Sequence, residues 1–197
     1  MKTIQFKIVL SSFLLLVIFS SCTKDSDADY PIAKTTLFAE DFSNASFSDT
    51  GWTVYAEQGI KNWSIGSYSG NGYAQMSSYQ SGQPVNVSWL ISPAFDFDKQ
   101  DGEKLFFQSC QDGFVKNQDN SLELFVSTDY DGTTFANANW KKIRFTGATQ
   151  DTKKYLYINS GTLDVSSYTG TVHFAFKYRG TTSQSGGYQM DNFRIFY

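Results

Sequence analysis

From Thr35 to the last residue, short apolar stretches alternate with polar turns. Aromatic and β-branched residues fill the stretches, and Gly, Asn, Asp and Ser separate them, as in Ser69-Gly70-Asn71-Gly72. No window of helical length carries a sustained apolar period of about 3.6 residues. The pattern therefore predicts strands at 35–42, 51–56, 62–67, 73–78, 88–91, 104–111, 121–128, 141–145, 155–158, 171–178 and 188–196.

Alternation within these strands predicts which residues face the core, because successive side chains of a strand point to opposite faces. The residues predicted to face inward in the two clearest strands are Leu122, Leu124 and Val126, then Val172, Phe174, Phe176 and Tyr178. Many short strands separated by turns are typical of an all-β fold, either a β-sandwich of two antiparallel sheets or a barrel. With no internal repeat or linker, residues 35–197 are predicted to form one domain.

The first and last strands each carry an acid in an apolar setting. Glu40 shares a face with Phe38 and Phe42, and by the same alternation Asp191 shares a face with Phe193. A buried carboxylate is costly unless it is paired, protonated or bound to a metal. The pattern predicts a shared cation where the chain ends meet, and calcium fits, since it takes about six to eight oxygen ligands. The alternatives are a buried salt bridge to a Lys or Arg and a twist that turns one of the acids to solvent, and a single histidine argues against zinc.

The N-terminus is typical of an exported lipoprotein. Lys2 and Lys7 precede an apolar run at 8–19, and a small pair of serines precedes Cys22. This predicts a lipoprotein signal peptide at 1–21 and acylation of Cys22 rather than a membrane span, because the apolar run is too short. A cleaved signal with an incidental cysteine is the alternative. Loss of both lysines changes the net charge from −3 to −5, and this acidity argues against a nucleic-acid partner.

Residues 22–34 are predicted to be a flexible acidic tether, because they are polar and rich in Asp. Asp25, Asp27 and Asp29 resemble signals that send lipoproteins to the outer face of some bacterial outer membranes, although a simple spacer would have the same composition. We therefore expect an outer-membrane lipoprotein that faces the cell surface. With Cys22 acylated, Cys110 has no disulfide partner and is predicted to be a buried structural thiol.

Aromatic residues are abundant, with 18 Phe, 12 Tyr and 4 Trp. Phe is concentrated on the apolar faces of strands, whereas several Tyr and Trp lie beside polar loops. Flat amphipathic rings in loops are suited to binding sugars or proteins, because they stack and still form hydrogen bonds. Ordinary loop packing is the alternative for any single ring. The predicted ligand-binding residues are Trp63, Tyr68, Tyr79, Tyr130 and Tyr155.

No arrangement of residues predicts catalysis. His173 is the only histidine and shares the polar face of its strand with Lys177, which predicts a surface position. Glycoside hydrolysis needs two acids across a cleft, and the spacing of Glu57, Glu103 and Glu123 shows no such pair. We therefore assign no catalytic residue and expect the protein not to be an enzyme.

A series of short motifs resembles the choice-of-anchor J, or cleaved-adhesin, domain, which is similar in turn to MAM-type jelly rolls. The motifs run in order along nearly all of 37–197: Glu40-Asp41-Phe42, Gly51-Trp52-Thr53, Trp63, Trp89-Leu90-Ile91-Ser92-Pro93, 122–129, 164–170 and Asp191-Asn192-Phe193-Arg194-Ile195. The resemblance implies a jelly-roll β-sandwich at the cell surface. It also implies a structural calcium ion, which by motif falls on Glu40, Asp41 and Asp191.

The sequence thus predicts a non-catalytic, surface-anchored module. Its predicted ligand is a glycan or another extracellular polymer, bound by aromatic loops on a frame stabilised by calcium. One alternative is a protein-binding adhesion or assembly module of the outer membrane. The second alternative is a glycoside hydrolase.

Overall fold

The computed structural model describes residues 34–113, 117–149 and 151–197. The predicted signal peptide, the predicted acylation site Cys22 and the predicted tether up to residue 33 lie outside the described residues.

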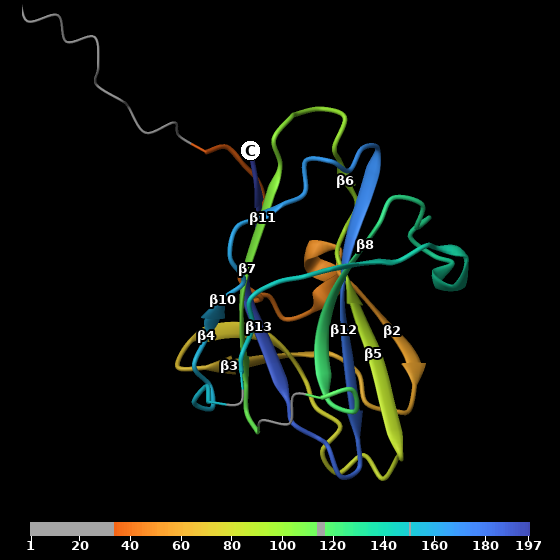
Figure 1. The fold of residues 1–197 in the computed structure, drawn as a ribbon, viewed down its shortest axis with the longest axis vertical. Coiled ribbons are helices and arrows are strands. Elements are labelled where there is room, and N and C mark those ends of the chain that lie inside the picture. Colours follow the sequence, from red (N-terminus) through yellow and green to blue (C-terminus); the bar gives the residue numbers. More distant parts are fainter. Residues whose placement is uncertain (1–33, 114–116, 150) are drawn as a thin grey trace, which may run out of the picture. The chain divides into compact units, whose positions relative to one another are not determined.

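Two antiparallel sheets pack face to face, which confirms the predicted all-β jelly-roll sandwich (Figure 1). The first sheet runs β10-β7-β13-β4-β3, with β1 also paired to β13 and β11 to β7. The second runs β2-β5-β12-β8-β9, with β6 also paired to β12. The first sheet comprises β1 (Thr36–Glu40), β3 (Ser64–Tyr68), β4 (Asn71–Met76), β7 (Lys104–Gln111), β10 (Ile158–Asn159), β11 (Leu163–Asp164) and β13 (Tyr188–Phe196). The second comprises β2 (Thr53–Gln58), β5 (Val85–Ile91), β6 (Phe95–Asp96), β8 (Ser121–Ser127), β9 (Lys141–Ile143) and β12 (Thr171–Thr181).

Every strand predicted from the sequence overlaps an observed one, and the differences concern very short elements. The strands β6 and β11 and the 3₁₀ helices η1 (Phe47–Thr50) and η2 (Phe135–Asn137) were not predicted, because two to four residues are too few to show a period. The strand predicted at 155–158 begins only at Ile158. Tyr155 instead adopts a left-handed backbone conformation, with φ of 60°.

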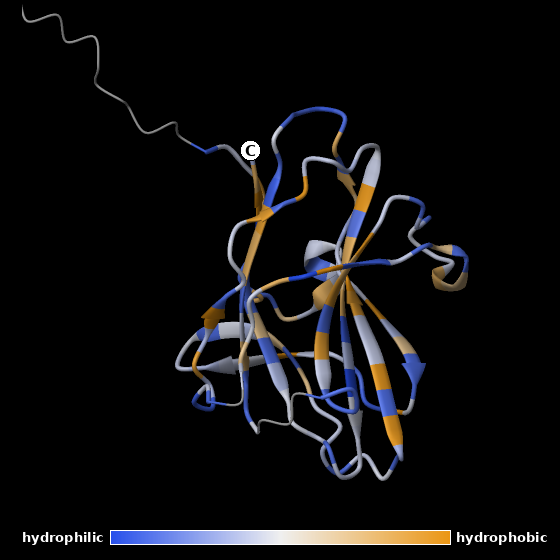
Figure 2. Cartoon of the chain, in the orientation of Figure 1, coloured by the Kyte–Doolittle hydropathy of each residue, from blue (hydrophilic) through white to orange (hydrophobic). Residues whose placement is uncertain are grey.

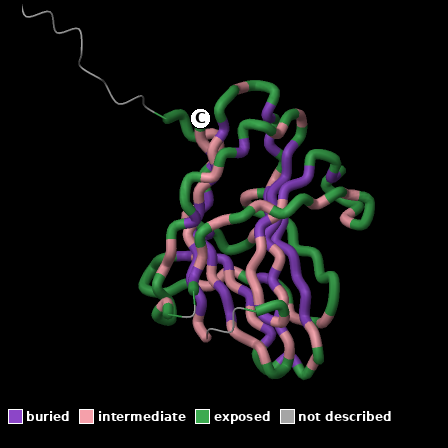
Figure 3. The backbone as a smooth tube through the Cα atoms, viewed as in Figure 1, coloured by how far each residue is buried: buried purple, intermediate pink, exposed green. Residues whose placement is uncertain are grey.

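The core lies between the two sheets, where apolar positions alternate with polar ones along each strand (Figures 2 and 3). The inward residues predicted on β12 are all fully buried, as are Leu124 and Val126 on β8, while Leu122 is partly buried against them. Trp52, Phe176 and Phe193 form contacting aromatic pairs at the centre of this core. Burial of each such side chain stabilises the fold by about 1.5–3 kcal/mol.

A β-bulge interrupts the last strand, β13. Asp191 pairs with Gln108 of β7 but Arg194 pairs with Phe106, so three steps along β13 match two along β7. Asn192, inside the bulge, has a φ of 52°. Met190 and Phe193 therefore both reach the core, and Asp191 turns to the outer face of the first sheet. The prediction that Asp191 shares a face with Phe193 is wrong for this reason.

A second aromatic cluster covers the outer face of the second sheet. The segment 128–140 places Tyr130, Phe135 and Trp140 over Trp89 of β5. The ring of Phe135 lies 4.9 Å from that of Trp89, and Tyr130 packs edge-on against His173 at 5.0 Å. His173 is therefore buried, and the prediction of a surface histidine is wrong because this segment covers its strand face.

In the part of the chain that the structure describes, no helix combines the length and apolar character needed to cross a bilayer.

Candidate functional site

A cavity of about 940 Å³ lies at one end of the first sheet, where several loops converge. Its strand-borne wall includes Gln75 of β4 and Gln189 of β13, which are direct partners across the sheet. Both side chains point outward, because each residue is flanked along its strand by residues buried in the core. Two neighbouring amides, each able to donate and to accept hydrogen bonds, thus lie side by side in the cavity wall.

Two exposed tyrosines line the same cavity from separate loops. Tyr79, in the loop between β4 and β5, is 64% exposed, and Tyr155, in the loop between β9 and β10, is 58% exposed. The N–H of Tyr155 donates to the carbonyl of Gln111 at 2.8 Å, which holds the loop against the end of β7. The positive φ of Tyr155 is a strained conformation for a side chain of this size, and such strain is often found at functional sites.

The amide of Gln189 is held by buried Cys110 and by half-buried Tyr157. Its Oε1 accepts hydrogen bonds from the hydroxyl of Tyr157 at 3.1 Å and from Sγ of Cys110 at 3.3 Å. Burial raises the pKa of the Cys110 thiol to about 11, so the thiol stays protonated and donates. The prediction of a buried structural thiol is confirmed. Because the amide oxygen is occupied, Gln189 retains its amide nitrogen as a donor toward the cavity.

A buried polar cluster behind the cavity connects its loops. The hydroxyl of Tyr178 accepts from the N–H of Ser78 at 2.9 Å and donates to the carbonyl of Gly186 at 3.1 Å. Asn120 joins it, with Nδ2 2.9 Å from the same carbonyl. Tyr178 belongs to the second sheet, whereas Ser78 and Gly186 flank the cavity in two different loops. One buried hydroxyl therefore fixes the spacing of those loops.

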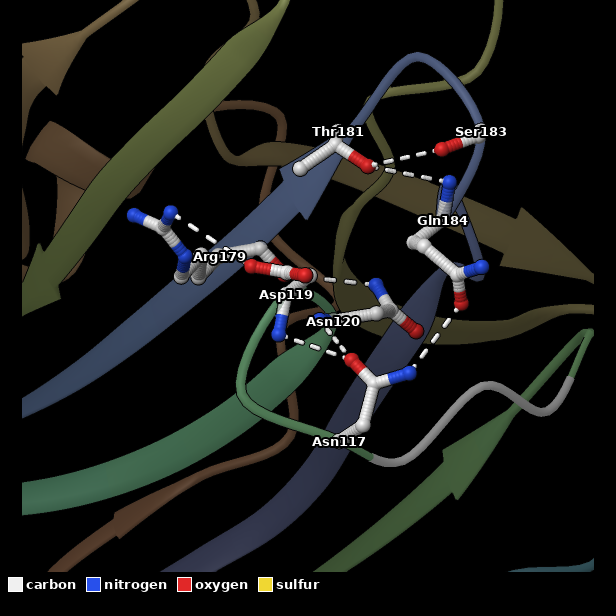
Figure 4. A network of polar contacts seen from close by, with 7 residues as sticks. All are labelled: Asn117, Asp119, Asn120, Arg179, Thr181, Ser183 and Gln184. Atoms are coloured by element: carbon white, nitrogen blue, oxygen red, sulfur yellow. Dashed lines mark hydrogen bonds and ion pairs between the residues drawn. The ribbon is translucent and has the colours of Figure 1, made fainter.

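The cluster continues at the surface as a network between the β7–β8 and β12–β13 loops (Figure 4). Asn117 donates through Nδ2 to Oε1 of Gln184 at 3.1 Å, and the N–H of Gln184 donates to Oγ1 of Thr181 at 3.0 Å. The guanidinium of Arg179 lies 3.7 Å from the carboxylate of Asp119. These contacts hold the β12–β13 loop, which supplies Ser183, Ser185 and Gly186 to the cavity wall.

The structure brings together two of the five predicted ligand-binding residues, Tyr79 and Tyr155. Tyr68 is 79% exposed but lies at the β3–β4 turn, outside the cavity wall. Trp63 is buried and donates through Nε1 to the carbonyl of Ser88 at 3.1 Å. Tyr130 is buried in the second aromatic cluster. The predictions for Trp63 and Tyr130 are therefore corrected, because no face of either ring is open to a ligand.

Sequence reasoning did not identify the amides and the charges of the cavity. Gln75 and Gln189 are far apart in the sequence, and only the pairing of β4 with β13 makes them neighbours. Lys61 and Lys154 also line the cavity, as does Asp112. Polar residues on the outward faces of strands and in loops are common, so nothing in the local sequence distinguishes these five.

The two acids of the terminal strands are both buried and do not line the cavity. Strand β1 pairs with β13, as predicted, and both Glu40 and Asp191 are only 4% exposed. Oε1 of Glu40 accepts the N–H of Phe42 at 2.7 Å, whereas its Oε2 is buried without a hydrogen-bond partner among the described residues. Oδ2 of Asp191 accepts from Nδ2 of Asn71 at 2.9 Å. The backbones are close here, since a Cβ on Gly72 would lie 2.1 Å from the carbonyl oxygen of Phe42.

Asp41, the third predicted metal ligand, lies elsewhere. Its side chain is exposed and accepts hydrogen bonds from the N–H and the hydroxyl of Ser43, which lower the pKa of the carboxyl group. Within 34–113, 117–149 and 151–197, no group of three or more His, Cys, Asp or Glu side chains is placed to hold a metal ion. A calcium ion at Glu40 would need amide and carbonyl oxygens beside the two carboxylates, and Oε2 of Glu40, which has no hydrogen-bond partner among the described residues, would be one of its ligands.

Residues 65–196 match the model of a family described as domain of unknown function (DUF5017). No curated protein matches the sequence. Among solved structures, the K1 cleaved adhesin domain of Lys-gingipain from Porphyromonas gingivalis W83 has a TM-score of 0.53 and 21% identity, over 80% of this chain and 96% of that domain.

Two further cleaved adhesin domains of Lys-gingipain are similar. The K2 cleaved adhesin domain has a TM-score of 0.51 and 17% identity, over 81% of this chain and 98% of that domain. The K3 domain, from strain w83, has a TM-score of 0.50 and 20% identity, over 84% of this chain and all 100% of that domain. At these identities the likeness establishes a shared fold, and it confirms the structural resemblance to cleaved adhesin domains.

Proposed function

This chain belongs to the DUF5017 family, and we propose that it is a non-catalytic module that binds a glycan in the cavity at the end of the first sheet. One observation carries the proposal: two exposed tyrosine rings from separate loops line a cavity whose wall holds the paired amides of Gln75 and Gln189.

The cavity has the chemistry that sugar recognition needs. Aromatic rings stack on the C–H faces of a pyranose, and amide groups form hydrogen bonds with its hydroxyls. The wall is mostly polar, which disfavours an apolar small molecule. The positions of the two rings are fixed by loops that are themselves hydrogen-bonded, so little conformational entropy is lost on binding.

Hydrolysis of the bound glycan is not part of the proposal. A glycosidase needs two carboxyl groups across the scissile bond, and Asp112 is the one acid among the described residues that line the cavity. Glu57 accepts from Nε1 of Trp89 and pairs with Lys177, and Glu123 pairs with Lys142. Those acids hold the outer face of the second sheet together.

Replacement of the two rings tests the proposed site. We expect Tyr79→Ala and Tyr155→Ala each to weaken glycan binding about tenfold, which corresponds to about 1.4 kcal/mol of lost stacking. Tyr68→Ala is the matched control, because it removes an even more exposed tyrosine that lies outside the cavity. Binding is measured by calorimetry on polysaccharides selected with a glycan array.

Equal binding by all three variants would reject the cavity as the site. A wild-type protein that binds no glycan but retains an outer-membrane protein in a pull-down would favour the adhesion or assembly alternative. Release of reducing sugar that is abolished by a single Glu→Gln change would favour the hydrolase.

The proposal includes a structural calcium ion bound by Glu40 and Asp191, near the gap that β1 and β4 leave along the edge of β13. The unpartnered Oε2 of Glu40 supports it. A ligand that binds only the folded state raises the melting temperature, so calcium should raise it and a chelator should lower it. Glu40→Gln and Asp191→Asn should remove this response, whereas Asp41→Asn, which alters an exposed acid, should keep it. If the first two variants keep the full change in melting temperature, the ion binds at a different site.

Anchoring at the outer face of the outer membrane through a lipid on Cys22 completes the proposal. The acidic residues Asp25, Asp27 and Asp29, after a signal-like leader, support it. The full chain expressed in a Gram-negative host should incorporate labelled palmitate and be cleaved by protease added to intact cells. Cys22→Ala should lose the label, and palmitate incorporation by this variant would contradict the assignment.

A further inference from the structure

We propose that the cavity selects polysaccharides that carry negative charge, as carboxylate or sulfate groups, and that Lys61 and Lys154 recognise this charge. The inference rests on the proposed function, because it names the class of glycan that the same cavity binds.

The two lysines enter the cavity from different loops. Lys61 lies between β2 and β3, and Lys154 lies between β9 and β10, directly before Tyr155. Neither ammonium group forms an ion pair with any carboxylate that the structure describes. By contrast, five other basic residues each pair with an Asp or a Glu: Lys99, Lys104, Lys142, Lys177 and Arg179.

Asp112, the acid of the cavity wall, is engaged by the backbone. Its Oδ1 accepts the N–H of Gly187, and a Cβ at that position would lie 2.5 Å from Oδ2. The carboxylate is thus fixed against the start of β13 rather than paired with a lysine. The cavity wall therefore carries two ammonium groups and one carboxylate. Its local charge is positive, although the net charge of the chain is −3.

A larger group of cations occurs in a groove on the outer face of the second sheet but is less suited to an anion. The groove is lined by Lys142, Arg144, Lys177 and Arg179. Lys142 already pairs with Glu123, Lys177 pairs with Glu57, and Arg179 pairs with Asp119. An anion there would have to compete with those carboxylates, whereas the cavity lysines are free.

Charge recognition and stacking are complementary in the cavity. An ammonium group forms short, charge-assisted hydrogen bonds with a carboxylate or sulfate, about twice as strong as neutral ones. Tyr155 follows Lys154 in the chain, so one loop presents a ring and a cation to the ligand. Because exposed charges are screened by salt, the contribution of the lysines should decrease as ionic strength rises.

The test compares polymers that differ only in charge. Polygalacturonate is compared with its fully methyl-esterified form, and dextran sulfate with dextran, by calorimetry at low and at high salt. We expect the wild-type protein to bind the charged member of at least one pair about tenfold more tightly at low salt. The pair that shows the preference identifies the anion as carboxylate or sulfate.

Lysine variants locate the preference. Lys61→Met and Lys154→Met keep the apolar stem and remove the charge, and the double variant should bind both members of a pair alike. Lys153→Met is the matched control, because this exposed residue of the same loop does not line the cavity. Thermal unfolding of each variant verifies that the fold is retained.

Three results would overturn the inference, and they differ in what they say of the function. If neutral and charged polymers bind alike and Tyr79→Ala weakens both, glycan binding stands and charge selection fails. If the double lysine variant still prefers the charged polymer, the negative charge of the ligand is recognised by residues other than these two lysines. If no polymer of either charge binds, charge selection and glycan binding in this cavity both fail.

Discussion

At the scale of single residues, His173 is the group whose setting differs most from its sequence context. Its Nδ1 lies 2.9 Å from the carbonyl oxygen of Ser92, an acceptor, so this nitrogen carries the proton. Tyr130 covers the ring edge-on. Burial lowers the pKa of His173 below its ordinary value. In the unfolded chain the ring takes up a proton near pH 6.5, whereas in the folded protein the burial of the ring requires a lower pH for protonation.

This difference predicts a pH-dependent stability. A group whose pKa is lower in the folded state contributes its full stabilisation at pH values above its unfolded-state pKa. This stabilisation is lost as the pH falls through the folded-state pKa. The free energy of unfolding in urea should therefore be constant from pH 8 to about 6.5 and decrease toward pH 5. Asp129 and Asp131 have pKa values of about 2 because of hydrogen bonds, so they titrate below this window.

His173→Gln supplies the comparison, because glutamine can still donate to the carbonyl of Ser92 but does not titrate. Its stability should be flat between pH 8 and pH 5. A decrease of the same size in this variant would assign the effect to other groups.

Residue type and immediate neighbours were enough to predict the environment of Cys110 but not that of His173. Cys110 lies in an apolar strand, and burial follows from that setting. His173 lies on a strand face that the sequence marks as polar, and its cover comes from Tyr130, far away along the chain. A local pattern does not report which distant segment packs over a sheet face.

At the scale of elements, strand positions and inward faces followed from alternation, because each side chain of a strand has a fixed direction. The bulge in β13 could not be predicted from alternation. One inserted residue reverses the phase of all that follow, so Asp191 and Phe193 lie on opposite faces despite their spacing. The only local sign is Asn192, since Asn tolerates the left-handed backbone conformation better than most residues.

The bulge gives a prediction for β13. Asn192→Val should lower the free energy of unfolding by about 1–3 kcal/mol, because a β-branched residue is strained at a φ of 52°. Asn192→Gly is the control: it also removes the hydrogen bond from Nδ2 to Gln108 but permits this φ. Urea unfolding of both variants separates backbone strain from the lost hydrogen bond. Equal losses would show that the backbone conformation carries no cost.

At the scale of the whole molecule, the sandwich brings distant loops to one cavity, and the sequence predicted only part of that assembly. Tyr79 and Tyr155 were identified because aromatic rings in polar loops are unusual enough to be noticed. Gln75 and Gln189 could not be identified from the sequence, because their proximity depends on the order of strands in the first sheet. The chemistry of the rings is local, but the geometry of the cavity depends on the complete fold.

The buried hydroxyl of Tyr178 links the core to this cavity, and its removal should affect both. Tyr178→Phe keeps the ring in the core but leaves the buried N–H of Ser78 without its acceptor. We expect the free energy of unfolding to decrease by about 1–3 kcal/mol. Glycan affinity should also decrease, although Tyr178 does not itself line the cavity, because Ser78 precedes Tyr79 and the loop is less firmly held.

The control for this change is Tyr168→Phe, which removes the hydroxyl of a partly buried tyrosine, and this hydroxyl makes no hydrogen bond among the described residues. It should leave both stability and affinity unchanged. Urea unfolding and calorimetry on the same preparations measure the two effects together. If Tyr178→Phe lowers stability but binds as tightly as the wild-type protein, then the loop that carries Tyr79 is positioned by contacts other than this hydroxyl. Loss of affinity without loss of stability would instead mean that the hydroxyl acts on the ligand-binding loops alone, and that the rest of the core does not depend on it.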